Sequence, residues 1–286
     1  MFHPGSVITS DCDLTSAMPC RPCAICVGEA RNDPNAMPAA LETLDLQKQF
    51  GAFRAVRGVS LRIEAGERHA LIGPNGAGKT TLVDLLSGTK RPSGGRILLE
   101  GRDVTHLAPH RRTRLGIART FQVNQLFGDL TPVESIGLAI SERARGGTDW
   151  WRNAGTEPEI TEEIARLLER LHLADVGGER VNRLPYGKQR LLEIALAVAC
   201  RPRVLLLDEP AAGVPEAERA GLLATIASAC NGTTILLIEH DMDLVFDFSD
   251  RISVLVNGSL FAQGTPEEIA RDPRVKSAYL GEDLHV

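Results

Sequence analysis

The residues best suited to chemistry in this sequence form one continuous stretch, Gly73 to Thr80, which reads GPNGAGKT. It matches the pattern G-x-x-x-x-G-K-[ST], in which glycines allow the backbone to bend closely around an anion. The successive N–H groups of such a loop, and the positive end of the helix that follows it, converge on a phosphate group. A glycine-rich turn before an ordinary helix would show the same letters, so the interpretation depends on the segments around it.

The flanking segments agree with a phosphate-binding loop. The short apolar segment His69 to Ile72 predicts a strand before the loop, and Lys79 to Leu86 predict a helix after it. Lys79 is expected to reach the β- and γ-phosphates of a nucleotide, and the Thr80 hydroxyl is expected to ligate Mg²⁺. The residues of this stretch expected to bind the nucleotide are Gly73, Pro74, Asn75, Gly76, Ala77, Gly78, Lys79, Thr80 and Thr81.

Two further apolar segments end in polar side chains. Val204 to Leu207 precede Asp208 and Glu209, and Thr233 to Ile238 precede a Glu and then His240. Continuous apolar runs are typical of strands covered on both faces, and ligands bind at the C-terminal edge of parallel α/β sheets. These residues favour phosphoryl transfer to water, with Asp208 holding Mg²⁺ through water, Glu209 polarising the attacking water and His240 contacting the γ-phosphate. An acidic turn after a strand is the alternative interpretation of the two carboxylates.

A second possible anion site lies at Gly187. The segment Leu191 to Ala199 is apolar almost all round and predicts a buried helix, which Gly187 would begin with bare N-terminal amides. Lys188 in the first turn opposes the helix dipole, so its position fits better if an anion is nearby. Gly187 and Lys188 are therefore candidate nucleotide contacts.

Two residues have weaker signals. Phe50 lies 23 residues before Gly73, where a flat apolar ring could stack on a nucleotide base. An inward-facing strand residue is the alternative interpretation of Phe50, and Phe53 is a rival for the stacking role. Gln122 ends an extended stretch and is uninformative by itself.

Composition limits the classes of function. A chain of 286 residues, 43% hydrophobic and 24% charged, is globular and has one large core or two lobes. A formal charge of -5 gives no electrostatic signature for binding nucleic acid. We expect a solvated helix face from the basic residues His110, Arg111, Arg112, Arg114 and Arg119. No apolar run approaches the length of about 18 residues that spans a bilayer, so a membrane role would require another chain.

Residues 1–36 differ from the rest of the sequence. They show no sustained periodicity and contain the four cysteines Cys12, Cys20, Cys23 and Cys26. We expect a disordered or spurious extension before a domain at 37–286; the alternative is that the thiolates hold Zn²⁺ or an iron–sulfur cluster. There is also no secretory signal peptide pattern. Cys200 and Cys230 are expected to be buried free thiols, which suits a reducing cytoplasm.

The remaining elements are predicted from periodicity and turns. Strands are expected at Leu41 to Phe50 and Ala55 to Ile63, and a hairpin around Asn257-Gly258. Apolar residues spaced by three and four positions predict helices between residues 130 and 180, namely at Ile160, Ile164, Leu167, Leu168 and Leu171. The pair Trp150–Trp151 in this region forms either a lid or a docking surface.

Together these motifs resemble the nucleotide-binding subunit of an ABC transporter, over residues 41–283. The matching motifs are Walker A at Gly73–Thr80, the Q-loop at Gln122, the signature at Leu184–Lys188, Walker B at Val204–Asp208 with its catalytic Glu209, and the switch His240. The stretches that start at Arg119, Leu184, Asp208, Ile238 and Ala278 are similar to the larger ATP-binding subunit of branched-chain amino-acid importers.

This resemblance implies an α/β fold, with a P-loop NTPase (ABC ATPase) core, a small antiparallel β subdomain and a helical subdomain at about 120–190. It implies ATP hydrolysis that powers amino-acid import, with ATP and Mg²⁺ bound. The catalytic residues would be Glu209, His240, Lys79 and Gln122, and the metal ligands Thr80, Gln122 and Asp208.

The resemblance also implies partners. These are two transmembrane permease subunits, a second ATPase subunit, paralogue or self, in a head-to-tail dimer, and indirectly a periplasmic or extracellular solute-binding protein. The chain would bind peripherally at the cytoplasmic face of the inner membrane, without nucleic acid. In the dimer, ATP would lie between Gly73–Thr80 of one subunit and Gly187 of the other.

The sequence departs from the family pattern at three places. Pro185 replaces the signature Ser and offers no hydroxyl to a γ-phosphate, Lys188 replaces a Gln, and Pro215 replaces the Asp of the D-loop. The alternatives are a urea or amide importer, a lipid exporter, or a soluble ABC ATPase without a transport role. A small-molecule kinase that uses the phosphate loop alone would leave Gly187, Gln122 and His240 unexplained.

Overall fold

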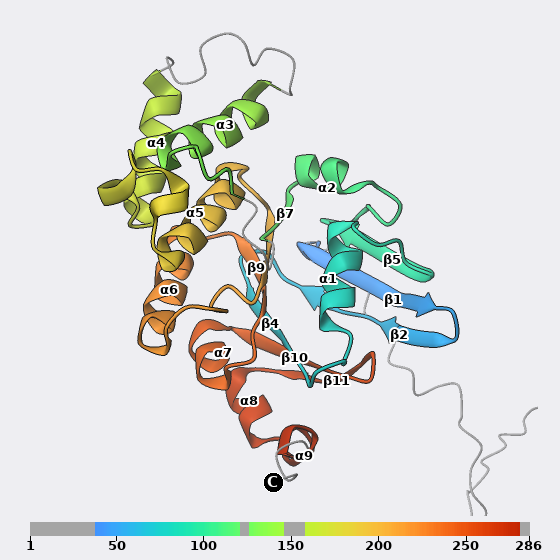
Figure 1. Ribbon diagram of the computed structural model, residues 1–286. Coiled ribbons are helices and arrows are strands. Elements are labelled where there is room, and N and C mark those ends of the chain that lie inside the picture. Colours follow the sequence, from blue (N-terminus) through green and yellow to red (C-terminus); the bar gives the residue numbers. More distant parts are fainter. Residues whose placement is uncertain (1–37, 121–125, 146–157, 281–286) are drawn as a thin grey trace, which may run out of the picture. The chain divides into compact units, whose positions relative to one another are not determined.

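The computed structural model describes residues 38–120, 126–145 and 158–280 (Figure 1). The chain divides after Met37, and every described residue belongs to the unit Pro38–Val286. The following predicted features lie outside the described residues: the extension at 1–36 with Cys12, Cys20, Cys23 and Cys26, the residue Gln122, and the pair Trp150–Trp151. Within the described ranges, no helix is long and apolar enough to cross a membrane.

A six-stranded sheet forms the centre of the molecule, in the order β11-β10-β4-β9-β8-β7. Its strands are β4 (Arg68–Ile72), β7 (Ile117–Arg119), β8 (Val204–Asp208), β9 (Thr234–Ile238), β10 (Arg251–Val256) and β11 (Ser259–Gly264). All pairs are parallel except β10 with β11. Every residue of β8 and β9 is buried, which explains their uninterrupted apolar sequences. Because the strands are parallel, the loops that follow β4, β8 and β9 leave from one edge.

A second, antiparallel sheet has the order β2-β1-β5-β6, with β3 paired to β1. Its strands are β1 (Leu41–Phe50), β2 (Phe53–Val59), β3 (Arg62–Ile63), β5 (Gly94–Leu99) and β6 (Arg102–Asp103). The segment predicted as one strand, Ala55 to Ile63, is divided between β2 and β3. At the break, the Thr43 hydroxyl accepts the Leu61 N–H at 2.9 Å and donates to the Val59 carbonyl at 2.9 Å, so a side chain takes part in the pairing there.

Helices cover both faces of the central sheet. They are α1 (Lys79–Ser87), α2 (Pro109–Leu115), α3 (Pro132–Arg145), α4 (Pro158–Arg170), α5 (Tyr186–Ala199), α6 (Glu216–Ala229), α7 (Met242–Phe248), α8 (Pro266–Arg271) and α9 (Pro273–Leu280), with 3₁₀ turns η1 (Ala174–Val176) and η2 (Val181–Arg183). The predicted apolar face of α4 is buried at Ile160, Ile164, Leu167 and Leu168. Helices α3, α4 and α5 pack together, as the predicted fold class requires.

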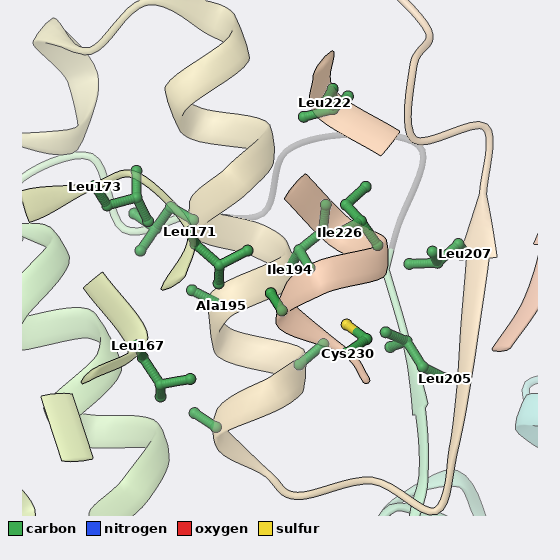
Figure 2. Packing of buried hydrophobic residues seen from close by; sticks show 14 of the residues in the cluster. Leu167, Leu171, Leu173, Ile194, Ala195, Leu205, Leu207, Leu222, Ile226 and Cys230 are labelled. Carbon is green, nitrogen blue, oxygen red and sulfur yellow. The ribbon is translucent and has the colours of Figure 1, made fainter. Parts of the chain in front are cut away.

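Strand β8 separates two hydrophobic clusters. Leu205 and Leu207 pack with α5 and α6 on one face, where Figure 2 shows them near Ile226 and Cys230. Val204 and Leu206 pack on the other face, with residues of α1. Helices α1 and α5 therefore lie on opposite faces of the sheet (Figure 1). Cys230 is a buried free thiol, as predicted, and burial raises its pKa to about 11, whereas Cys200 is only partly buried.

The prediction of a solvated basic face is wrong for two of its five residues. His110, Arg111 and Arg114 are exposed, but Arg112 is buried and the side chain of Arg119 is only 11% exposed. Arg112 Nη1 donates to the carbonyls of Leu85 and Leu86 at 2.6 and 2.7 Å, and Nη2 donates to the Thr105 carbonyl at 2.8 Å. It thereby gives a donor to two carbonyls at the C-terminal end of α1, of which that of Leu85 also accepts the Gly88 N–H at 3.2 Å.

Candidate active site

The predicted phosphate loop joins the end of β4 to the start of α1. Gly78 is the N-cap of α1 and has a φ of 101°, a conformation that favours glycine. A Cβ at Gly73 would lie 2.1 Å from the carbonyl oxygen of Leu255, and a Cβ at Gly78 would lie 2.5 Å from that of Ala55. Neighbouring backbone thus leaves no room for a side chain at either position.

The hairpin turn between β10 and β11 supports this loop. The turn residues Asn257 and Gly258 have φ values of 48° and 79°, as the predicted Asn-Gly turn requires. The Gly258 N–H donates to the Ala77 carbonyl at 2.9 Å, and the Gly258 carbonyl accepts the Arg57 N–H at 2.8 Å. The hairpin therefore ties the phosphate loop to strand β2.

Lys79 folds back over the loop. Its side chain is buried, and Nζ donates to the Gly73 carbonyl at 2.5 Å and to the Pro74 carbonyl at 3.1 Å. Thr80, in the first turn of α1, is exposed, and so are Asn75 and Gly76. The Lys79 ammonium and the N-terminal end of α1 thus lie beside a loop that requires glycine at positions 73 and 78. This arrangement suits a phosphate ligand.

Asp208, the last residue of β8, has one carboxylate oxygen that is hydrogen bonded and one that is not, within the described ranges. Its side chain is fully buried, and Arg119 Nη2 donates to Oδ2 at 2.8 Å. Its other oxygen, Oδ1, is buried and has no hydrogen-bond partner among the described residues. Burial raises the pKa of Asp208, although the Arg119 guanidinium opposes this change.

The residues present fit a magnesium ion bound together with a nucleotide. In the described part of the chain, no group of three or more His, Cys, Asp or Glu side chains is placed to hold a metal. Mg²⁺ is usually held by one or two protein oxygens together with substrate phosphates. The unpartnered Oδ1 of Asp208 and the exposed hydroxyl of Thr80 provide such oxygens.

Glu209 and His240 form a close pair. His240 Nε2 lies 2.6 Å from Glu209 Oε1, and both side chains are partly exposed. Glu209 has a φ of 49°, a conformation that costs energy for a residue with a side chain. Its N–H donates to the Ile238 carbonyl at 2.9 Å, so the ends of β8 and β9 hold this turn in place. A carboxylate beside an imidazole is suited to general base chemistry.

Glu239, which was not predicted as a site residue, connects the same two strand ends. It is buried, and its carboxylate accepts the Ala211 N–H at 2.9 Å and the His240 N–H at 3.3 Å. Burial raises its pKa, although these backbone hydrogen bonds lower it. An acid between a buried strand and a predicted site residue is the signal that could have identified it.

The second predicted anion site is not part of the phosphate-loop site within one chain. Gly187 lies in the first turn of α5, on the opposite face of the sheet from α1. Lys188 Nζ binds Asp175, at 2.8 Å from Oδ1, and the His172 carbonyl at 2.5 Å. Pro185 is the N-cap and makes no side-chain cap hydrogen bond. The charge of Lys188 is thus balanced by Asp175.

Phe50 is available for stacking. It is 43% exposed, so the inward-facing alternative is wrong, and it lies opposite Phe53, which is 61% exposed. The ammonium groups of Lys48 and Lys90 lie 5.0 and 5.7 Å from the centre of its ring. Both aromatic rings remain candidates for contact with a base.

Comparison with known proteins identifies relatives along most of the chain. The family model described as ABC transporter matches residues 56–212, and the one described as branched-chain amino acid ATP-binding cassette transporter matches residues 259–285. The high-affinity branched-chain amino acid transport ATP-binding protein BraF of Pseudomonas aeruginosa is 41% identical, over 85% of this chain and 98% of its own length. LivG of Escherichia coli K12, with the same description, is 42% identical over 83% of this chain and 96% of its own length.

Solved structures agree with this result. The ADP conformation of MJ1267, an ATP-binding cassette of an ABC transporter, has a TM-score of 0.73 at 31% identity and covers 86% of this chain and 100% of its own. A nucleotide-free cassette from an ABC transporter has the same TM-score at 30% identity, covering 84% of this chain and 98% of its own. These similarities confirm the predicted α/β fold class.

Proposed function

Since the chain belongs to the ABC transporter family as an ATP-hydrolysing, nucleotide-binding subunit, we propose that it powers the import of branched-chain amino acids. The amino-acid part of this proposal rests on the relatives, and the observation that carries its ATPase part is the meeting of three segments at one edge of the sheet. The phosphate loop follows β4, Asp208-Glu209 follow β8, and His240 follows β9. These segments provide an anion cradle, an oxygen for a metal ion and a base, which are the parts that ATP hydrolysis requires.

In the proposed reaction the phosphate loop and Lys79 bind the phosphates of ATP. Thr80, Asp208 and Gln122 are the proposed ligands of Mg²⁺, which neutralises phosphate charge when it is bound. Glu209 takes a proton from water as the water oxygen attacks the γ-phosphorus, and the bond to the β–γ bridging oxygen breaks. His240, 2.6 Å from Glu209, orients this carboxylate and contacts the γ-phosphate.

The opposite placement of α1 and α5 supports a dimer. The helix that follows the phosphate loop packs on one face of the sheet and α5 packs on the other, which favours a nucleotide that is bound by the two segments from different subunits. We propose that Gly187 completes the nucleotide site of a second ATPase subunit, paralogue or self. Two transmembrane permease subunits would bind this dimer at the cytoplasmic face, and a solute-binding protein would deliver the amino acid.

Purification of the tagged chain from its native membranes tests this function. Two polytopic subunits and a second ATPase subunit are expected to purify with it. In vesicles supplied with the solute-binding protein, the complex should import labelled leucine when ATP is present. Isolation of the chain without polytopic subunits, or import of urea in place of leucine, would contradict the proposal.

A further inference from the structure

A chain of four charged side chains extends from α1 to the end of β8. Lys90 Nζ donates to Asp84 Oδ2 at 2.6 Å, and Arg119 Nη1 donates to Asp84 Oδ1 at 2.6 Å. The other terminal nitrogen of Arg119, Nη2, donates to Asp208 Oδ2 at 2.8 Å. One guanidinium therefore connects the helix that follows the phosphate loop with the proposed metal ligand.

The fold brings these residues together over long separations in sequence. Strands β7 and β8 are neighbours, with Arg119 beside Leu206, so the guanidinium at the end of β7 lies next to the end of β8. Asp84 lies among the apolar residues Leu82, Val83 and Leu85 on the buried face of α1. A carboxylate in such a position is costly unless it is paired, and Arg119 and Lys90 pair it.

We propose that Arg119 is a positioning residue, which holds Oδ2 of Asp208 so that Oδ1 is the oxygen available to the metal–nucleotide complex. This inference rests on the proposed ATPase function. Two hydrogen-bonding nitrogens of Arg119 are held by two different carboxylates, so the guanidinium is fixed in its plane and fixes the carboxylate that it binds. The buried Oδ1, which has no hydrogen-bond partner among the described residues, is left for the ligand.

The charges of the group limit the repulsion that the guanidinium would exert on a cation. Arg119 and Lys90 carry two positive charges and Asp84 and Asp208 carry two negative charges, so the four cancel. Asp84 balances the charge of Arg119 through Nη1, whereas Asp208 binds Nη2. The main effect of Arg119 is therefore geometric, as for other residues that orient the ligands of a metal.

Lys90 connects the same group of charges with Phe50, the proposed contact of the nucleotide base. Its ammonium lies 5.7 Å from the centre of the Phe50 ring while it binds Asp84. Phe50, proposed to contact the nucleotide base, and Asp208, proposed to bind the metal, are thus joined through Lys90, Asp84 and Arg119.

The test compares four full-length variants: Arg119→Met, Arg119→Lys, Asp208→Asn and, as control, Arg114→Met, an exposed arginine of α2. The affinity of Mn²⁺ is measured by electron paramagnetic resonance with a non-hydrolysable ATP analogue present. The affinity of a fluorescent ATP analogue without metal is measured in EDTA. Arg119→Met is expected to weaken Mn²⁺ binding at least about tenfold, as loss of a ligand-orienting partner does.

The same variant should bind metal-free nucleotide within about twofold of the parent, because the phosphate loop is intact. Arg119→Lys should recover part of the Mn²⁺ affinity, since a lysine can still donate to Oδ2, and Arg114→Met should behave as the parent. In the ATPase assay of Arg119→Met, the factor by which the Mg²⁺ concentration for half activity rises should exceed the factor by which kcat falls.

Unchanged or tighter Mn²⁺ binding in Arg119→Met would show that the arginine only stabilises the fold, and would overturn the inference. Equal losses of metal-free and metal-bound nucleotide would also overturn it. If the parent chain itself binds no Mn²⁺ with the nucleotide, the proposed function fails, and this result is distinct from a failure confined to Arg119.

Discussion

The backbone conformation of Glu209 places its carboxylate beside His240, at a φ of 49° that a residue with a side chain adopts at a cost. We predict that Glu209→Gln retains ATP binding and lowers the hydrolysis rate roughly 10²–10⁴-fold, because an amide cannot accept the proton of water. Phosphate release and equilibrium binding of ATP measure the two effects. Glu216→Gln, at an exposed acid in the first turn of α6, is the matched control. Sustained turnover by Glu209→Gln would remove this residue from its role.

His69, in the strand β4 that leads to the phosphate loop, is fully buried between two partners. Its Nδ1 lies 2.6 Å from Glu67 Oε1, and its Nε2 lies 2.8 Å from the Ser253 hydroxyl of β10. Burial by itself would raise the pKa of Glu67, but the hydrogen bond with His69 and the one from the Glu64 N–H lower it more, so its net direction is down.

A lowered carboxylate pKa makes stability depend on pH on the acid side. The contribution of Glu67 is present above its unfolded pKa, about 4.3, and is lost as the pH falls through the lower folded value. We predict that the unfolding free energy of the parent falls more steeply than that of Glu67→Gln below about pH 4.3. Urea unfolding at a series of pH values measures this, with Glu159→Gln, an exposed acid of α4, as control. Parallel curves for parent and variant would contradict the prediction.

At the scale of elements, Arg112 connects α2 to the C-terminal end of α1. Its guanidinium donates to the carbonyls of Leu85, Leu86, Thr105 and Leu107, and burial lowers its pKa to about 10. We predict that Arg112→Met destabilises the protein by about 2–4 kcal/mol, since the buried carbonyls of Leu85, Leu86 and Thr105 lose the guanidinium as a donor. Arg111→Met, on the exposed side of the same helix, should stay within about 0.5 kcal/mol of the parent. Chemical unfolding gives both values, and equal effects would argue against a role for burial.

The β10–β11 hairpin provides a second test at this scale. Gly258 and Gly232 both have positive φ values, 79° and 81°. A Cβ at Gly258 would lie 2.6 Å from the Ala55 carbonyl, whereas a Cβ at Gly232 would meet nothing within 4 Å. We predict that Gly232→Ala costs about 1 kcal/mol from backbone strain alone and that Gly258→Ala costs more.

Because the Gly258 N–H donates to Ala77 of the phosphate loop, the shift of the turn that the new Cβ forces in Gly258→Ala should also weaken ATP binding, which Gly232→Ala should not. Thermal unfolding and nucleotide titration of the two variants measure these effects. If the two alanine variants lose the same stability and bind ATP equally, the hairpin does not support the phosphate loop.

At the scale of the whole molecule, the separation of α1 and α5 by the sheet predicts that ATP binding and assembly are separable. Gly187→Asp adds an acid to the first turn of α5, which a helix tolerates there, but the acid would repel the γ-phosphate held by a second subunit. In the Glu209→Gln background, we predict that Gly187→Asp leaves ATP affinity within about twofold and abolishes the ATP-dependent dimer. Light scattering during gel filtration measures the assembly, and a dimer that persists would place the interface elsewhere.

The sequence predicted the parts of the site whose geometry depends on near neighbours. The residues of Gly73–Thr80, the carboxylates after the apolar run of β8 and the Asn257-Gly258 turn all lie as expected. Such features are set by backbone torsions and by continuous apolar runs, which short segments encode. The roles predicted for the site residues, those of Phe50, Gly187 and Lys188 included, remain predictions.

The tertiary structure alone decided how charged side chains pair across the fold. Arg119 reads as one of several basic residues, yet its partners Asp84 and Asp208 are 35 and 89 positions away in sequence. Lys188 similarly binds Asp175, and Arg112 binds the end of α1. The pairing of buried charges depends on which segments the fold brings together, so the sequence by itself determined the candidate chemistry and the tertiary structure decided which groups position it.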